Sequence, residues 1–221
     1  MKSSDGVESV IQLLIDSEDR WKAYYMAFWG FSYVLRDKYE NTTEWEIKRS
    51  WGLPASKNKK HEYSPKKLHG ILTSNDDNIT AEHLITLFSL FEALIDAACP
   101  ILYGKKVSAS RFPQMANFLN AEGKFKGGKR FVSDDEFREL RLAKETRNCF
   151  IHNAGKIDSR FIKAYEEARG KLGATVGDRL QKAFPSSDRR HRGDDLLPTV
   201  EDWHNLIINI AIRIKSEIKA K

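Results

Sequence analysis

Three side chains near the end of one predicted helix could together transfer protons and bind a phosphate: Arg147, Asn148 and His152. An imidazole acts as a general acid or base near neutral pH, and a guanidinium binds two phosphate oxygens at once. Attack of a ribose 2′-hydroxyl on the adjacent phosphate needs a base, an acid for the leaving 5′-oxygen and a cation beside the developing charge. These residue types therefore suit RNA cleavage without a metal ion.

The spacing of these residues predicts a site shared between two copies of the chain. On a helix, Asn148 and His152 lie about 40° apart, whereas Arg147 lies roughly 140° from His152. One helix cannot easily aim both groups at one phosphate, but two copies meeting across a two-fold axis can. We therefore expect a homodimer with a composite groove. The alternative is structural: Arg147 pairs with Glu92 or Glu145, and His152 caps the helix.

The helix that carries these residues has clear start and stop signals. Ser133 and Glu136 form a predicted capping box, and the acidic residues between them favour a helix N-terminus. Gly155 offers a left-handed stop, so His152 is expected in the last turn.

Two further apolar patterns predict the core helices that must hold this one. Thr80 is the expected N-cap of a strongly apolar helix through Ile95, and Glu92 stands within it as a candidate support for Arg147. A last helix is expected to begin around Thr199 or Glu201, and a modest one from Ser159 to Lys171. In the first eighty residues, a short apolar stretch is expected from Val7 to Ile15. A longer helical pattern follows, with one stripe of Trp21, Tyr25, Phe28, Ser32 and Leu35 and with Tyr24 and Phe31 beside it. We expect its aromatic residues to pack in the core rather than to stack on bases.

Basic, glycine-punctuated segments separate these patterns. Asn41 to Asn78, Gly104 to Phe131 and Pro185 to Pro198 are expected to be loops. In the second, four cations are candidates for contact with a phosphate backbone, a solvated loop being the alternative: Lys124, Lys126, Lys129 and Arg130.

The totals favour an all-α protein. The 221 residues are 41% hydrophobic and 31% charged, with only 6 prolines. We expect an N-terminal helical extension and basic loop over residues 1–78 and a helical bundle over residues 79–221. A net charge of +6 makes polyanions plausible partners. Cys99 and Cys149 fit buried free thiols, no metal or cofactor motif is present, and no leader or long apolar run appears, so a cytoplasmic location is expected.

The segment from Arg147 to Gly155, with the turn after it, resembles the signature helix of the HEPN family. The segment from Leu87 to Asp96 is similar to an earlier core helix of that family, so the resemblance covers roughly Thr80 to the C-terminus. It implies an up-and-down helical bundle that dimerises. Many members are metal-independent endoribonucleases with an arginine, a polar neighbour and a histidine, and Arg147, Asn148 and His152 occupy those places here.

The resemblance implies a homodimeric cytoplasmic endoribonuclease of the toxin or anti-phage defence type. It would cleave RNA by 2′-hydroxyl attack, without a cofactor, and an antitoxin or other regulatory protein is a possible partner. A second hypothesis is a non-catalytic module that binds RNA or another protein. A third is a nucleotide-sensing module that regulates a neighbouring effector.

Overall fold

The computed structural model describes residues 4–41, 76–153, 157–169 and 193–221. Within these ranges every regular element is a helix and there is no strand, which confirms the predicted all-α class. The elements are α1 (Ser4–Asn41), α4 (Asp76–Tyr103), α5 (Phe112–Leu119), the 3-10 turn η2 (Gly123–Phe125), α6 (Asp134–Asn153), α7 (Ser159–Arg169) and α9 (Gly193–Lys219).

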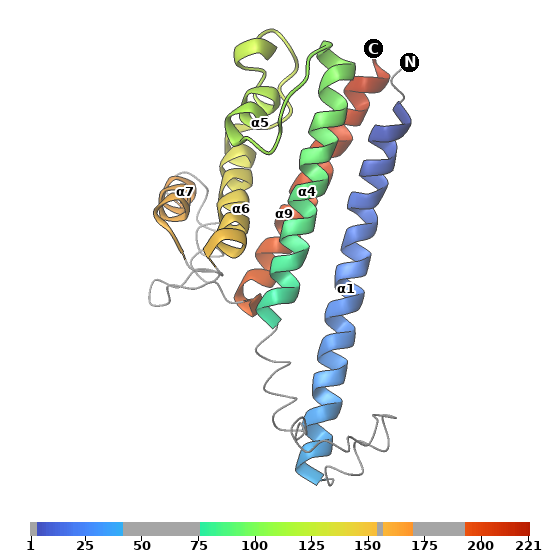
Figure 1. The fold of residues 1–221 in the computed structure, drawn as a ribbon, viewed down its shortest axis with the longest axis vertical. Helices are drawn as coiled ribbons and strands as arrows, with labels where there is room; N and C mark the ends of the chain where they lie inside the picture. The colour runs from blue at the N-terminus through green and yellow to red at the C-terminus, as the bar shows by residue number, and fades with distance from the viewer. Residues whose placement is uncertain (1–3, 42–75, 154–156, 170–192) are drawn as a thin grey trace.

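The long helices form an up-and-down bundle (Figure 1). Helices α1 and α6 run away from the end where both chain termini lie, and α4 and α9 run back toward it. Helix α4 packs against both α1 and α9, and α7 packs on α6. Helix α5 lies beside the start of α6, and α6 begins at the end of the bundle near the termini and finishes at the other end (Figure 1).

Helix α1 contributes to the same core as α4 and α9. Its buried side chains are spaced at helical intervals: Val7, Ile11, Leu14 and Trp21. The two apolar stretches expected here are one continuous helix of 38 residues. The expected core role is confirmed for Trp21, whereas Tyr24 is 71% exposed. The predicted boundary between residues 78 and 79 falls in the first turn of α4.

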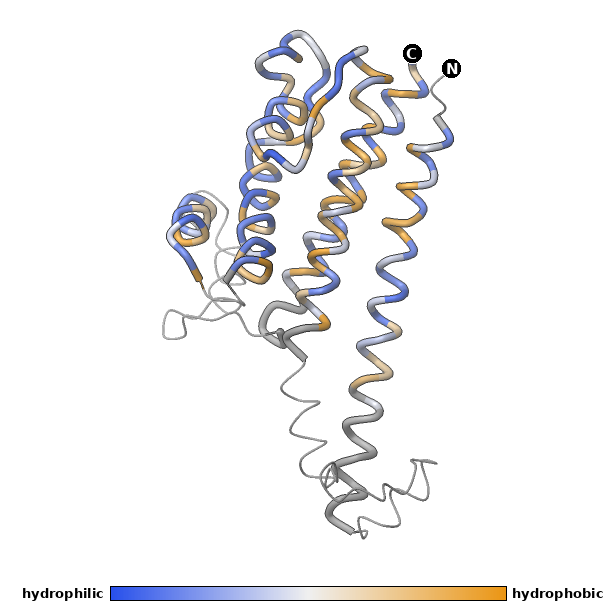
Figure 2. Tube along the Cα trace, viewed as in Figure 1, coloured by the Kyte–Doolittle hydropathy of each residue, from blue (hydrophilic) through white to orange (hydrophobic). Residues whose placement is uncertain are grey.

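Helix α4 is the centre of the bundle, and apolar residues run along most of its length (Figure 2). Its fully buried residues include Leu84, Leu87, Phe88, Phe91, Leu94 and Ile95. The stretch Ile79–Tyr103 has the length and hydropathy of a membrane span, but such values are also typical of a buried core helix. The predicted cap at Thr80 is wrong, because α4 already begins at Asp76 and Thr80 is buried inside it.

Two other expectations fail for local reasons. The segment from Gly104 to Phe131 contains α5, which begins where Pro113 supplies a preformed first turn and which buries Met115 and Phe118. Helix α9 begins at Gly193 rather than near Thr199, with Pro198 inside it. Most of the expected loops Asn41 to Asn78 and Pro185 to Pro198 lies outside the described residues, namely 42–75 and 185–192. The described parts are helical: Asn41 ends α1, residues 76–78 begin α4 and residues 193–198 begin α9.

The start of α6 matches its prediction in detail. The Ser133 N–H donates to Glu136 Oε2 at 2.8 Å, and the Glu136 N–H donates to Ser133 Oγ at 3.2 Å, which confirms the capping box. Arg213 of α9 donates to both Glu136 carboxylate oxygens, at 2.7 and 2.8 Å. The same bonds hold the pKa of Glu136 at about 2, chiefly through Arg213. The cap therefore also joins α6 to α9.

A stack of three rings joins α1, α4 and α9. Trp21 lies parallel to His83 with 4.3 Å between ring centroids, and His83 lies parallel to His204 at 5.2 Å. His83 Nε2 and His204 Nδ1 are 3.1 Å apart and share a hydrogen bond. Burial, followed by the nearby His204, lowers the pKa of His83 to about 3, and burial also lowers the pKa of His204. Both rings are therefore neutral at neutral pH.

The histidine pair should make stability fall in mild acid. Below pH 6.5, the ordinary pKa of histidine, His83 binds a proton in the unfolded chain. In the folded chain it stays neutral down to about pH 3. The stabilisation is thus complete above pH 6.5, and the free energy of unfolding should fall by about 1 kcal/mol per pH unit for each such histidine below it. Urea unfolding at pH 7, 6 and 5 measures this slope.

Two variants separate the pair from other histidines. The slope should become shallower in His83→Gln and also in His204→Gln, because each variant removes one histidine whose pKa burial lowers. A wild-type profile that is flat from pH 6.5 to pH 5 would mean that the pair takes up protons without unfolding.

Candidate functional site

A buried ion pair fixes α6 against α4. Lys144 Nζ lies 3.2 Å from Glu92 Oε1 and donates to the Ser110 carbonyl oxygen at 3.1 Å. The ammonium also lies 5.4 Å from the centre of the Phe112 ring. The side chains of Lys144 and Glu92 are only 4% and 13% exposed. The sequence suggested Arg147 as the partner of Glu92, and this is wrong. Lys144 binds Glu92 instead, because it lies one helical turn earlier and faces α4.

Arg147 and Asn148 follow within one turn of this anchor. Arg147 Nη1 donates to Asn148 Oδ1 at 3.2 Å, and Asn148 Nδ2 donates to Glu145 Oε2 at 3.3 Å. Arg147 Nε is buried and has no hydrogen-bond partner. In the described part of the chain, neither Glu92 nor Glu145 forms an ion pair with Arg147. The half-buried guanidinium therefore has an amide oxygen as its direct partner, and the Glu145 carboxylate is linked to it only through the Asn148 amide.

His152 lies in the last turn of α6, as predicted, and its side chain is exposed. Ile151, the residue before it, is 40% exposed, and Ile162 of α7 is 47% exposed. Cys149, between Asn148 and His152, is buried, and burial raises the pKa of its thiol to about 11, so the thiol stays protonated. The expected stop at Gly155 lies outside the described residues.

The structure thus places Arg147, Asn148 and His152 on the last two turns of one helix. The hydrogen bond from Arg147 to Asn148 draws the guanidinium toward the face that Asn148 shares with His152. A single chain therefore carries a guanidinium and an imidazole within the last two turns of one helix. Among the described residues, no group of three or more histidines, cysteines or carboxylates is placed to hold a metal ion.

The predicted phosphate-contacting cations lie at the other end of α6. They precede Asp134, the first residue of α6, which is 18 residue steps and therefore about 27 Å along the helix from His152 at 1.5 Å per step (Figure 1). Lys129 pairs with Glu217 at 3.1 Å, and Arg130 pairs with Asp134. Lys124 and Lys126 lie beside Lys129 around one pocket, which Arg130 does not line. The structure therefore does not bring these four residues to the arginine and histidine.

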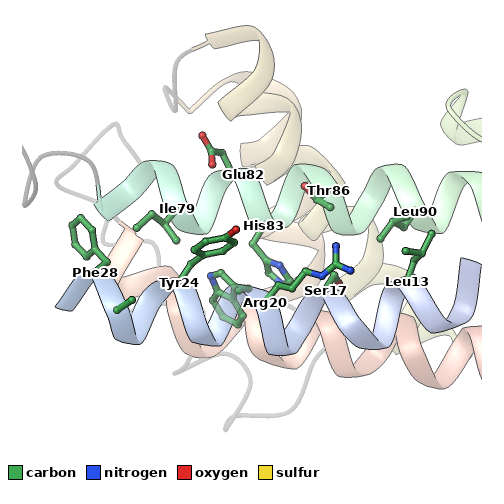
Figure 3. Close-up of a pocket in the computed structure, with 12 residues that line it drawn as sticks. Leu13, Ser17, Arg20, Tyr24, Phe28, Ile79, Glu82, His83, Thr86 and Leu90 are labelled. Atoms are coloured by element: carbon green, nitrogen blue, oxygen red, sulfur yellow. The ribbon is translucent and has the colours of Figure 1, made fainter. Parts of the chain in front are cut away.

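A groove of about 830 Å³ between α1 and α4 was not expected from the sequence (Figure 3). Its walls are mainly apolar, and Tyr24 and Ile79 face each other across it, while Glu82 points away from α1. His83 lines the groove as a neutral ring engaged with His204, which leaves Arg20 as the cation of this surface. The aromatic residues expected in this helix were the sequence signal for it, since Trp21, Tyr24 and Phe28 line the groove.

Loss of one partner of the Lys144–Glu92 pair should destabilise the protein more than loss of both. Glu92→Leu leaves a buried ammonium without its counter-charge and should cost about 3 kcal/mol, whereas Glu92→Leu with Lys144→Met should recover much of that loss. Denaturant unfolding of both variants measures the difference.

The matched control is Lys163→Met, which removes an exposed cation on α7. It should change the free energy of unfolding by less than about 0.5 kcal/mol. If the double variant proved as unstable as Glu92→Leu, the ion pair would not be what anchors α6.

Comparison with known proteins gives no relative for this chain. No protein-family model matches it, and neither the curated proteins nor the solved structures contain a match. The resemblance to the HEPN family therefore stays a prediction.

Proposed function

We propose that the chain is a metal-independent endoribonuclease of the HEPN type, acting in toxin or anti-phage defence, with its site where two copies meet at the end of α6. The observation that carries the proposal is the state of Arg147: within the described residues, its charge has a neutral amide oxygen as partner and no carboxylate. A guanidinium left in that state on a half-exposed surface is suited to bind a phosphate.

The chemistry uses groups on this one surface. His152 of one copy takes the proton of the ribose 2′-hydroxyl while the 2′-oxygen attacks phosphorus. As the bond between phosphorus and the 5′-oxygen breaks, the protonated His152 of the second copy gives its proton to the leaving oxygen. Arg147 binds the charge that develops on the phosphorane, and Asn148 holds the guanidinium. The products are a 2′,3′-cyclic phosphate and a 5′-hydroxyl.

The surroundings of His152 support contact with a second copy. Ile151, which precedes His152 in the chain, and Ile162 of α7 are both exposed, and their two helices pack together. Exposed apolar side chains at this end of the molecule would gain from burial against a protein partner. A two-fold contact through this surface would bring both His152 side chains and both Arg147 side chains to one groove.

Replacement of the site residues should abolish RNA cleavage in the presence of EDTA. Arg147→Ala and His152→Ala should each lower the cleavage rate at least about 100-fold, because one loses the phosphate ligand and the other the proton transfer. Arg147→Lys should remain impaired, since an ammonium lacks the bidentate geometry. The measurement is gel analysis of labelled single-stranded RNA, with the cyclic phosphate identified by mass spectrometry.

Lys163→Ala is the control for charge near the site and should cleave at the wild-type rate. Full activity in both Arg147→Ala and His152→Ala would rule out this site. RNA that the wild-type protein binds but leaves intact would instead indicate a non-catalytic RNA-binding module.

A further inference from the structure

A polar pocket of about 340 Å³ lies at the end of the bundle near the termini, far from the proposed cleavage site. Five lysines and a single glutamate line it, along with the Tyr103 and Phe125 rings: Lys105, Lys124, Lys126, Lys129, Lys221 and Glu217. Such an excess of positive charge around one depression is unfavourable in the absence of an anion.

The lysines are held in place by neutral acceptors. Lys105 Nζ donates to the Lys124 carbonyl oxygen at 2.7 Å, and Lys124 Nζ donates to the Lys106 carbonyl oxygen at 2.6 Å. Lys221 Nζ donates to the Leu102 carbonyl oxygen. These bonds fix three ammonium groups without neutralising them. Each ammonium has three donors, so each keeps donors for a further acceptor.

The backbone around the pocket is shaped for close approach. A Cβ atom on Gly128 would lie 2.5 Å from the Tyr103 hydroxyl oxygen, so only glycine fits beside this ring. Gly127 has a φ of +87°, which glycine adopts readily. Burial raises the pKa of Tyr103, so its hydroxyl stays protonated and can donate a hydrogen bond. Glu217 is paired with Lys129 at 3.1 Å.

We propose that this pocket binds the phosphate group of a nucleotide or of a nucleic acid end. The donors on its wall are ammonium groups and a phenol, which suit a compact oxyanion of more than one negative charge. The proposal does not depend on the proposed ribonuclease activity, because α6 separates the two sites.

Titration with inorganic pyrophosphate by isothermal calorimetry tests the pocket. We expect saturable binding that weakens at least about tenfold in the double variant Lys105→Gln with Lys124→Gln, since each glutamine keeps a donor but loses the charge. Lys219→Gln is the matched control: this lysine ends the same helix as Glu217 but reaches toward Glu8, 3.7 Å away, and its loss should change the affinity less than about twofold. Absence of saturable binding, or an equal loss in Lys219→Gln, would overturn the proposal.

Amide shifts of Gly127 and Gly128 provide a second measurement that does not depend on a variant. They should be among the largest in the nuclear magnetic resonance spectrum on addition of pyrophosphate, and shifts confined to other helices would overturn the assignment.

The source of the phosphate is identified with Arg147→Ala protein, which should leave RNA intact. Tighter binding of a nucleoside diphosphate than of pyrophosphate would support a nucleotide ligand. Tighter binding of 5′-phosphorylated RNA than of the same RNA with a 5′-hydroxyl would support a nucleic acid end. Equal binding of the two RNAs, with no binding of the diphosphate, would contradict the proposal.

Discussion

The buried contact between Lys144 and Glu92 sets the position of everything that the proposed site uses. It joins α6 to the central helix α4, and through the Ser110 carbonyl oxygen it also holds the segment that leads into α5. Arg147 lies three residues later, so the rotation of α6 that buries Lys144 also decides which way the guanidinium faces. Because Glu92 is occupied by Lys144, Arg147 is left with an amide oxygen as its partner.

Two further contacts hold the helices of the bundle together. At the start of α6, the capping box shares Glu136 with Arg213 of α9, and in the core the neutral His83 and His204 pair joins α4 to α9 beneath Trp21 of α1. These contacts make a frame with the exposed His152 imidazole at one end and an excess of ammonium groups at the other. The two functions proposed for the chain therefore occupy surfaces that a single helix holds apart.

The sequence allows the local features of this frame to be predicted, because they depend on neighbours along the chain. The capping box spans four residues, and the stripe of α4 repeats at three and four residues, so both were expected and both are present. The partner of Glu92 is 52 residues away, and two cations one turn apart were equally available, so the choice of Lys144 needed the packed structure. The start of α9 was predicted several residues too late because a proline such as Pro198 usually ends or starts a helix. Helix α5 was missed because its eight residues lie between basic, glycine-containing segments. The catalytic roles of Arg147, Asn148 and His152 rest on the resemblance and stay a proposal.

The distance between two copies of the end of α6 is the most direct test of the composite site. Two separate variants each carry one spin label: Lys163→Cys, on α7 beside that end, and Glu122→Cys, at the opposite end. The labelling is selective because Cys99 and Cys149 are buried. In electron spin resonance of RNA-cleaving protein, the distance between copies should be short for Lys163→Cys and much longer for Glu122→Cys. The reverse order, or cleavage by protein that shows no coupling between copies, would contradict a site formed by two copies of α6.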